Sequence, residues 1–145
     1  MNTNKKLDEA AFKDSISITH RHMLAVINTM LKYEKSLSDK STIKILDAGC
    51  GGGMMIYFLN KYLPLFNVDK KFLIYGYDLI DHGVQEAGFA KKAFSYLYEN
   101  APEIDWSDRI KLIRSNECWP FENEFFDIVI SNQVLEHVWD HYQFF

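Results

Sequence analysis

The chain has 145 residues, of which 48% are hydrophobic and 25% are charged, and 16 basic against 20 acidic side chains give a net charge of −4. This composition is that of an ordinary globular domain, and it excludes a disordered tail, a collagen-like repeat and a low-complexity linker. The longest strictly apolar run, Met54 to Leu59, is far shorter than the roughly 18 residues of a membrane span. Because the N-terminus also lacks the apolar segment of a signal peptide, we expect a cytoplasmic protein without a membrane span.

The distribution of charge and cysteine argues against nucleic acid and metal as ligands. After Arg114 the sequence carries six acidic residues and no Lys or Arg, so this segment would repel a polyanion. Cys50 and Cys118 lie far apart, and neither belongs to a metal-type cysteine pair. We therefore expect a small molecule as substrate, no nucleic-acid partner and no metal site.

The first 42 residues are predicted to be mainly helical. We expect a helix over 7–36, in two pieces, because Met23, Ile27, Met30 and Leu31 fall on one helical face. A polar connector follows this segment and leads into the first predicted strand.

Beyond the connector, strands alternate with helices. Runs of β-branched and aromatic residues predict strands at 43–46, 72–77, 110–113 and 126–130. A helix over 54–63 follows the first strand and is predicted to end at Pro64, and a second helix over 84–98 follows the second strand. Another helix is predicted to start at Val134. This alternation predicts an α/β fold with a parallel sheet and right-handed crossover helices.

A glycine-rich loop, Asp47-Ala48-Gly49-Cys50-Gly51-Gly52-Gly53, lies between the first strand and the first crossover helix. Glycine accepts both a positive φ and the close approach of a ligand. A P-loop would need a Lys and a Ser or Thr after the last glycine, where this chain has Met54 and Met55. A dinucleotide loop would need a third glycine at position 54, so an NAD-dependent oxidoreductase is a disfavoured alternative.

The spacing that fits is acid-x-Gly-x-Gly-x-Gly, met by Asp47, Gly49, Gly51 and Gly53. Here the chain resembles the class I S-adenosylmethionine-dependent methyltransferases. The resemblance implies a Rossmann-like parallel sheet flanked by helices. It also implies that these four residues bind the methionine and ribose parts of the cofactor, S-adenosyl-L-methionine.

An acid at the end of the second strand is the next element of the resemblance. Asp78 would face the same crevice as the glycine loop, because the carboxyl ends of neighbouring parallel strands meet at one edge of the sheet. The family uses an acid at this place to accept hydrogen bonds from the ribose hydroxyls. Leu79, the next residue, would pack against the adenine.

The segment after the third strand matches the family less closely. Trp119-Pro120-Phe121 resembles the family's Leu-Pro-Phe-like turn, which places Ser115 where the family commonly has an adenine-binding Asp. Asn116 and Glu117 are the nearest replacements, and we expect them to contact the cofactor. Packing in the core is an equally good explanation for Trp119 and Phe121.

The last element runs from Ser131 to Val138 and contains Leu-Glu-His-Val. It is similar to a signature of many small-molecule methyltransferases, in which these residues lie between cofactor and acceptor. The resemblance implies a cofactor contact for Asn132. His137 would take a proton from the acceptor and Glu136 would orient a donor, whereas simple packing of His137 near the cofactor is the alternative.

The complete family fold has seven strands, and this sequence supplies four. We therefore expect a fold truncated after the fourth strand, with 1–42 as an N-terminal helical cap and 43–145 as the cofactor-binding part of a methyltransferase domain. The fourth strand would then be an exposed apolar edge, through which the chain could associate with itself.

The expected function is transfer of a methyl group from S-adenosylmethionine to a small-molecule acceptor, such as a sugar, a lipid or a quinone-type precursor. A noncatalytic methyltransferase-like binding module is the alternative from another class, since three of the family's strands are missing.

Overall fold

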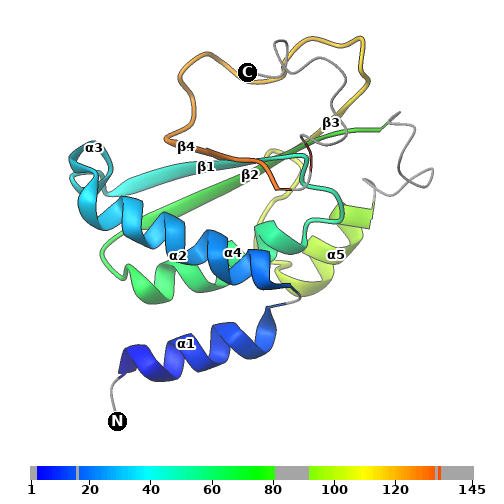
Figure 1. Ribbon diagram of the computed structural model, residues 1–145. Helices are drawn as coiled ribbons and strands as arrows, with labels where there is room; N and C mark the ends of the chain where they lie inside the picture. The colour runs from blue at the N-terminus through cyan, green and yellow to red at the C-terminus, as the bar shows by residue number, and fades with distance from the viewer. Residues whose placement is uncertain (1–2, 16, 81–91, 133, 135–145) are drawn as a thin grey trace.

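The computed structural model describes residues 3–15, 17–80, 92–132 and 134 (Figure 1). Helices within these ranges are α1 (Thr3–Asp14), α2 (Ile18–Tyr33), α3 (Lys35–Ser38), α4 (Met54–Phe66) and α5 (Lys92–Asn100). Strands within them are β1 (Thr42–Ala48), β2 (Lys71–Leu79), β3 (Ile110–Ile113) and β4 (Ile128–Ile130). The alternation of strands and helices confirms the predicted α/β fold.

The four strands form one parallel sheet in the order β3-β2-β1-β4. β1 lies in the middle, with Ile45 opposite Ile74 of β2 and Ile128 of β4. Because the strands all run in one direction, their carboxyl ends share one edge of the sheet. The glycine loop and Asp78 lie at that edge. Among the described strands β4 is an edge strand, as the sequence predicts for a fold truncated after it.

Helices cover one face of the sheet, and the connector between β3 and β4 lies over the other (Figure 1). α4 packs on β2, and α2 packs on α4. Ile43, Ile45 and Leu46 of β1 and Ile56 and Leu59 of α4 have no exposed surface. Burying such a side chain contributes about 1.5–3 kcal/mol, so the two elements that flank the glycine loop are held firmly.

Aromatic rings pack over the face of the sheet that the helices leave uncovered. The Tyr75 ring of β2 makes edge-on contacts with Phe121, Phe125 and Phe126, at 5.4–6.2 Å between ring centres. The Lys44 ammonium of β1 lies 3.8 Å from the centre of the Phe125 ring. The segment before β4 thus packs against the sheet through aromatic contacts.

The predicted end of the helix after the glycine loop is wrong, because Pro64 lies inside α4 and the helix continues to Phe66. Proline has no N–H to donate to the Asn60 carbonyl, but less than one turn of helix follows it. The Asn67 N–H donates to the Leu63 carbonyl at 3.0 Å and closes that turn.

Other predicted boundaries differ by a few residues. The segment predicted as two helical pieces over 7–36 forms three helices, since Glu34 has an extended backbone between α2 and α3. β2 continues through Asp78 to Leu79, and β4 begins at Ile128 instead of Phe126. Of the helix predicted over 84–98, the part before residue 92 lies outside the described residues, as does the helix predicted to follow Val134.

The N-terminal helices share a core with the sheet. Leu24, Ile27 and Leu31 of α2 are buried in the same cluster as the residues of β1 and α4. The division into 1–42 and 43–145 stays a prediction, as does the cytoplasmic location. None of the described helices has the length and apolarity needed to cross a membrane.

Candidate functional site

The loop after β1 has the backbone that its glycine spacing predicts. Gly49, Gly51 and Gly53 have φ values of 84°, 51° and 79°. This left-handed region is unfavourable for residues with a Cβ. Gly52 has no positive φ. The three glycines of the acid-x-Gly-x-Gly-x-Gly pattern are therefore the three that the turn requires.

The loop also lacks room for side chains at two of these positions. A Cβ on Gly49 would lie 2.2 Å from a methyl carbon of Val134, and one on Gly53 would lie 3.1 Å from the Leu97 side chain. Gly53 is also the N-cap of α4. The glycine loop thus passes between α5 and the chain after β4.

Hydrogen bonds tie the loop to β2. The N–H groups of Gly49 and Cys50 donate to the Tyr77 carbonyl at 2.8 and 3.0 Å. The Gly51 N–H donates to Oδ2 of Asp78 at 2.6 Å. The Cys50 thiol is buried, and burial raises its pKa well above the ordinary value, so it packs as a neutral group.

Asp78 therefore lies where the sequence predicts the ribose-binding acid. Its side chain is almost fully buried, and Oδ1 accepts a hydrogen bond from the Leu79 N–H at 2.7 Å. Each carboxylate oxygen has two lone pairs, so an oxygen that already accepts one hydrogen bond can accept a second.

Asp47 is the second carboxylate at this edge, and it is only 2% exposed. Its pKa is raised to about 7, because burial removes water from the carboxylate and the nearby Asp78 adds a like charge. The structure thus brings Asp47, the three glycines and Asp78 together, as predicted. A positively charged ligand placed there would favour the ionised form of Asp47.

Of the residues predicted to lie near the adenine, one is already hydrogen-bonded within its own turn. Leu79 is half-buried and is paired with Ile113 of β3. Glu117 accepts a hydrogen bond from the Arg114 N–H at 2.8 Å and so closes the turn after β3. Asn116 is exposed in that same turn. Both residues lie at the correct edge of the sheet, but the Glu117 carboxylate is engaged by its own turn.

For Trp119 the sequence left core packing and cofactor contact open, and the cofactor contact stays a prediction. Its ring lies 5.0 Å from that of Tyr77 in β2, and 49% of its surface is exposed. It therefore packs on the sheet and also presents a free aromatic surface.

Asn132, just after β4, contacts the N-terminal helices. Its side-chain amide donates to the Thr19 hydroxyl at 3.5 Å, which places the start of α2 beside the end of β4. His20 is buried there and stacks on Phe58 at 5.3 Å, and burial lowers its pKa. Sequence analysis missed Thr19, because a contact across 113 positions leaves no local pattern.

His137 and Glu136, the predicted catalytic pair, lie outside the described residues. Within the described ranges there is no group of three or more side chains suited to hold a metal ion.

Comparison with known protein families identifies the family of this chain. A family model described as a methyltransferase domain matches residues 17–145, from the start of α2 onward. The chain belongs to the methyltransferase-domain family. This confirms the predicted methyltransferase family, with its Rossmann-like fold and S-adenosylmethionine as cofactor, and it disfavours the NAD-dependent alternative.

Among solved structures, this methyltransferase chain is similar to a proposed S-adenosyl-L-methionine-dependent methyltransferase from Methanococcus maripaludis. The two share 15% sequence identity, with a TM-score of 0.47. The match covers 81% of this chain and 52% of the other, so this chain spans about half the length of that protein. No curated protein matches the methyltransferase chain.

Proposed function

We propose that the protein transfers the methyl group of S-adenosylmethionine to a small-molecule acceptor. The observation that carries the proposal is the glycine loop, with three positive φ values, joined to Asp78 by a hydrogen bond of 2.6 Å. Gly49, Gly51 and Gly53 would allow the methionine and ribose parts to approach the backbone. Asp78 would accept from the ribose hydroxyls, and Leu79 would pack on the adenine.

The charge of the site supports a cationic cofactor. S-adenosylmethionine carries a positive sulfonium, and the site holds two buried carboxylates within electrostatic reach of each other. A bound sulfonium would offset their repulsion and favour ionised Asp47. The nicotinamide dinucleotides carry a negative pyrophosphate, which the same pair would repel.

Methyl transfer itself needs little from the protein beyond alignment, because the cofactor supplies the reactive group. Positioning two reactants can lower a barrier by about 7–11 kcal/mol. In this proposal His137 takes a proton from the acceptor and Glu136 orients a donor. Asn132 contributes to the wall between cofactor and acceptor, beside the start of α2.

For the adenine, we propose contacts from Asn116 and Glu117. Glu117 would keep its hydrogen bond to the Arg114 N–H, and its free lone pairs would face the ligand. The acceptor class, a sugar, a lipid or a quinone-type precursor, is proposed from the resemblance to small-molecule members of the family.

We further propose that the chain associates with itself through β4. Val129 is 60% exposed on this short apolar strand, and β4 pairs with β1 on one side only among the described strands. Unpaired strand edges tend to pair with another chain.

Titration calorimetry with S-adenosylhomocysteine and with NADH tests the proposed function. We expect a micromolar dissociation constant for S-adenosylhomocysteine and no measurable heat with NADH. Tighter binding of NADH would overturn the proposal. Methyl transfer by the protein would exclude the noncatalytic alternative, and cofactor binding without any transfer would favour it.

A further inference from the structure

A cavity lies far from the glycine loop, between α1, α2 and the last turn of α4. Its volume is about 210 Å³, and most of its lining is apolar. The lining residues are Ala11, Phe12, Arg21, Leu24, Ala25, Asn28 and Phe66. An apolar cavity of about 150 Å³ is large enough to bind benzene, so this one can hold a small organic molecule.

Arg21 is the one charged residue in the lining of this cavity, beside the polar Asn28. Nε of Arg21 is buried, and it has no hydrogen-bond partner among the residues that the structure describes. The guanidinium carbon lies 4.2 Å from the centre of the Phe12 ring, in a cation–π contact. Contact with an aromatic face leaves the in-plane N–H donors available, and a guanidinium presents these donors as a fork that matches a carboxylate.

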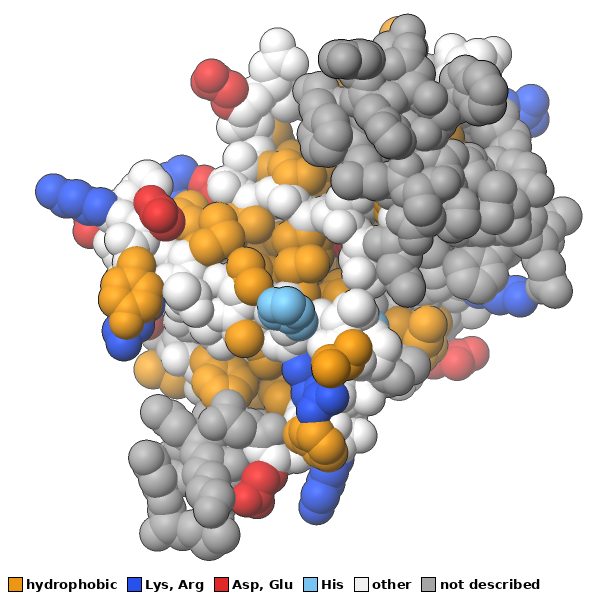
Figure 2. Space-filling model, viewed as in Figure 1, with side chains coloured by type: hydrophobic (Ala, Val, Ile, Leu, Met, Phe, Trp, Pro, Cys, Tyr) orange, Lys and Arg blue, Asp and Glu red, His pale blue; other side chains and the backbone are white. Residues whose placement is uncertain are grey.

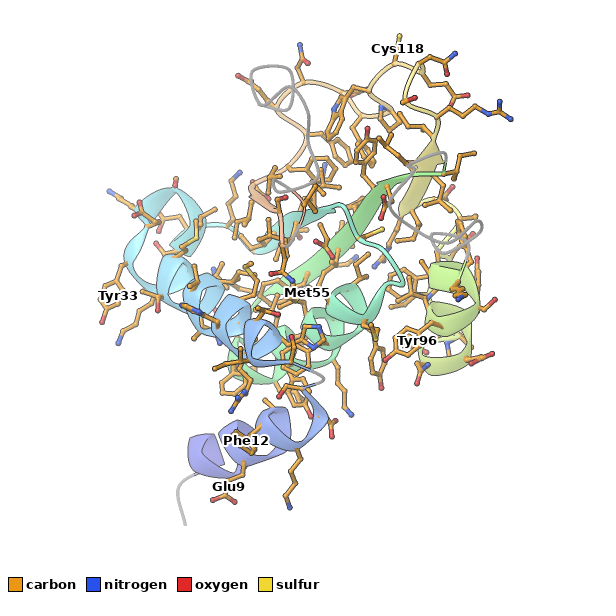
Figure 3. The ribbon with its side chains drawn as sticks, turned by 45° about the vertical axis from the view of Figure 1, so that its right-hand side comes forward. Glu9, Phe12, Tyr33, Met55, Tyr96 and Cys118 are labelled. Carbon is orange, nitrogen blue, oxygen red and sulfur yellow. The ribbon has the colours of Figure 1, made fainter. Side chains whose placement is uncertain are left out.

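Of the acidic side chains that the structure describes in α1, Glu9 and Asp14, neither supplies that carboxylate. Asp14, at the end of α1, accepts hydrogen bonds from Lys61 and Tyr62. Glu9 points away from α2, on the opposite side of α1 (Figure 3). In Figure 2 hydrophobic side chains lie next to basic ones on the face where α1 meets α2. This end of the molecule therefore combines apolar surface with uncompensated positive charge.

The cavity is separate from the cofactor site. Phe66, which lines it, is the last residue of α4, whereas the glycine loop precedes the first residue, Met54. Thirteen helical residues span about 20 Å at about 1.5 Å each. A ligand in this cavity would thus leave the glycine loop free.

We propose that this cavity is a binding site for a small apolar monocarboxylate, whose carboxylate pairs with Arg21 and whose hydrocarbon part fills the space beside Leu24 and Phe66. A buried donor without an acceptor is costly, and a bound carboxylate would supply the acceptor. The apolar side chains beside Arg21 reduce its contact with water, which strengthens the pairing.

The test titrates the protein with hexanoate, and with 1-hexanol as its uncharged counterpart. NMR of the arginine Nε–H signals reports binding. The chain has three arginines, so Arg109 and Arg114 serve as internal controls. We expect hexanoate to shift the Arg21 signal saturably, with a dissociation constant of about 1 mM or lower. We expect 1-hexanol to leave that signal nearly unchanged, and saturating S-adenosylhomocysteine to leave the hexanoate affinity unchanged.

Substitutions test the space in the cavity and the charge of Arg21 separately. Ala25→Phe fills the cavity and keeps the charge, so it should abolish hexanoate binding, whereas Ala10→Phe on exposed α1 surface outside the lining should not. Arg21→Met should weaken hexanoate at least tenfold without changing the melting temperature by more than a few degrees.

Four results would overturn the proposal. They are the absence of a saturable Arg21 shift, an equal response to 1-hexanol, and hexanoate binding that persists in Ala25→Phe or disappears with S-adenosylhomocysteine. None of them bears on the methyltransferase proposal, because the cofactor titration is measured separately.

Discussion

The Gly51 N–H donates to Oδ2 of Asp78 at 2.6 Å, and this bond joins the loop after β1 to the end of β2. The acid expected to hold the ribose therefore also holds the loop expected to hold the rest of the cofactor. A hydrogen bond to a charged acceptor is worth about 1.5–3 kcal/mol. Asp78 thus shapes the site before any ligand enters it.

Replacing Asp78 separates these two roles. Asp78→Asn keeps one acceptor oxygen for the loop but loses the charge, and Asp78→Ala loses both. We expect S-adenosylhomocysteine to bind about tenfold more weakly to Asp78→Asn and about 100-fold more weakly to Asp78→Ala, corresponding to about 1.4 and 2.7 kcal/mol. Asp69→Ala, in the exposed turn before β2, is the calorimetric control. Equal affinities for both Asp78 variants and wild type would contradict the assigned role.

Asp47 should make the protein less stable as the pH rises. In the folded chain its pKa is about 7, against about 3.9 in an unfolded chain. The folded state therefore binds more protons between these values, so this contribution is full below pH 4 and is lost as the pH rises through 7. Asp47→Asn should gain stability relative to wild type across this window, by no more than about 4 kcal/mol. Urea unfolding at pH 4 to 8 measures the free energy of unfolding of both proteins. A difference between them that does not change with pH would be inconsistent with a raised pKa.

Asp127, unlike Asp47, should make the protein more stable as the pH rises. Its carboxylate accepts from the Lys44 N–H at 2.7 Å and from the Lys40 ammonium, while its own N–H donates to the Lys44 carbonyl at 2.9 Å. Burial raises the pKa of Asp127, but these hydrogen bonds lower it overall. Its stabilisation is therefore present above about pH 4 and lost as the pH falls. Asp127→Ala should cost about 1–3 kcal/mol near pH 7 in chemical unfolding. A loss no larger than that of Asp69→Ala would show that this link does not hold β4.

Self-association through β4 predicts a concentration-dependent mass. Val129→Lys places a charge on the exposed side of the edge strand, which disfavours strand pairing. We expect wild type to dimerise in sedimentation equilibrium and Val129→Lys to remain a monomer. Val68→Lys, at another highly exposed valine (89%), is the matched control. A monomeric wild type would rule out this association.

The sequence predicted the strands and the glycine loop because both depend on local patterns. Three of the four residues from 43 to 46 are apolar, two of them β-branched isoleucines, and Gly49, Gly51 and Gly53 match the three positions where the turn needs a positive φ. The position of Asp78 followed from parallel topology alone, since neighbouring strands end at the same edge.

Other features depend on contacts that no local pattern records. Pro64 predicts a helix end, but the bond from the Asn67 N–H to the Leu63 carbonyl completes one more turn. The burial of His20 against Phe58 and the bond between Asn132 and Thr19 both require α2 to lie over the sheet. The same packing forms the Arg21 cavity, which has no signature in the sequence.

We propose that the positive-φ glycines build the cofactor site. The most direct measurement compares the affinities of Gly51→Ala and Gly52→Ala for S-adenosylhomocysteine by calorimetry. A Cβ at the left-handed Gly51 costs about 1–2 kcal/mol of strain and disturbs the bond to Asp78, whereas Gly52 has no positive φ. We predict binding at least tenfold weaker for Gly51→Ala, with a smaller change for Gly52→Ala. Wild-type affinity in Gly51→Ala, or a larger loss in Gly52→Ala, would contradict the account.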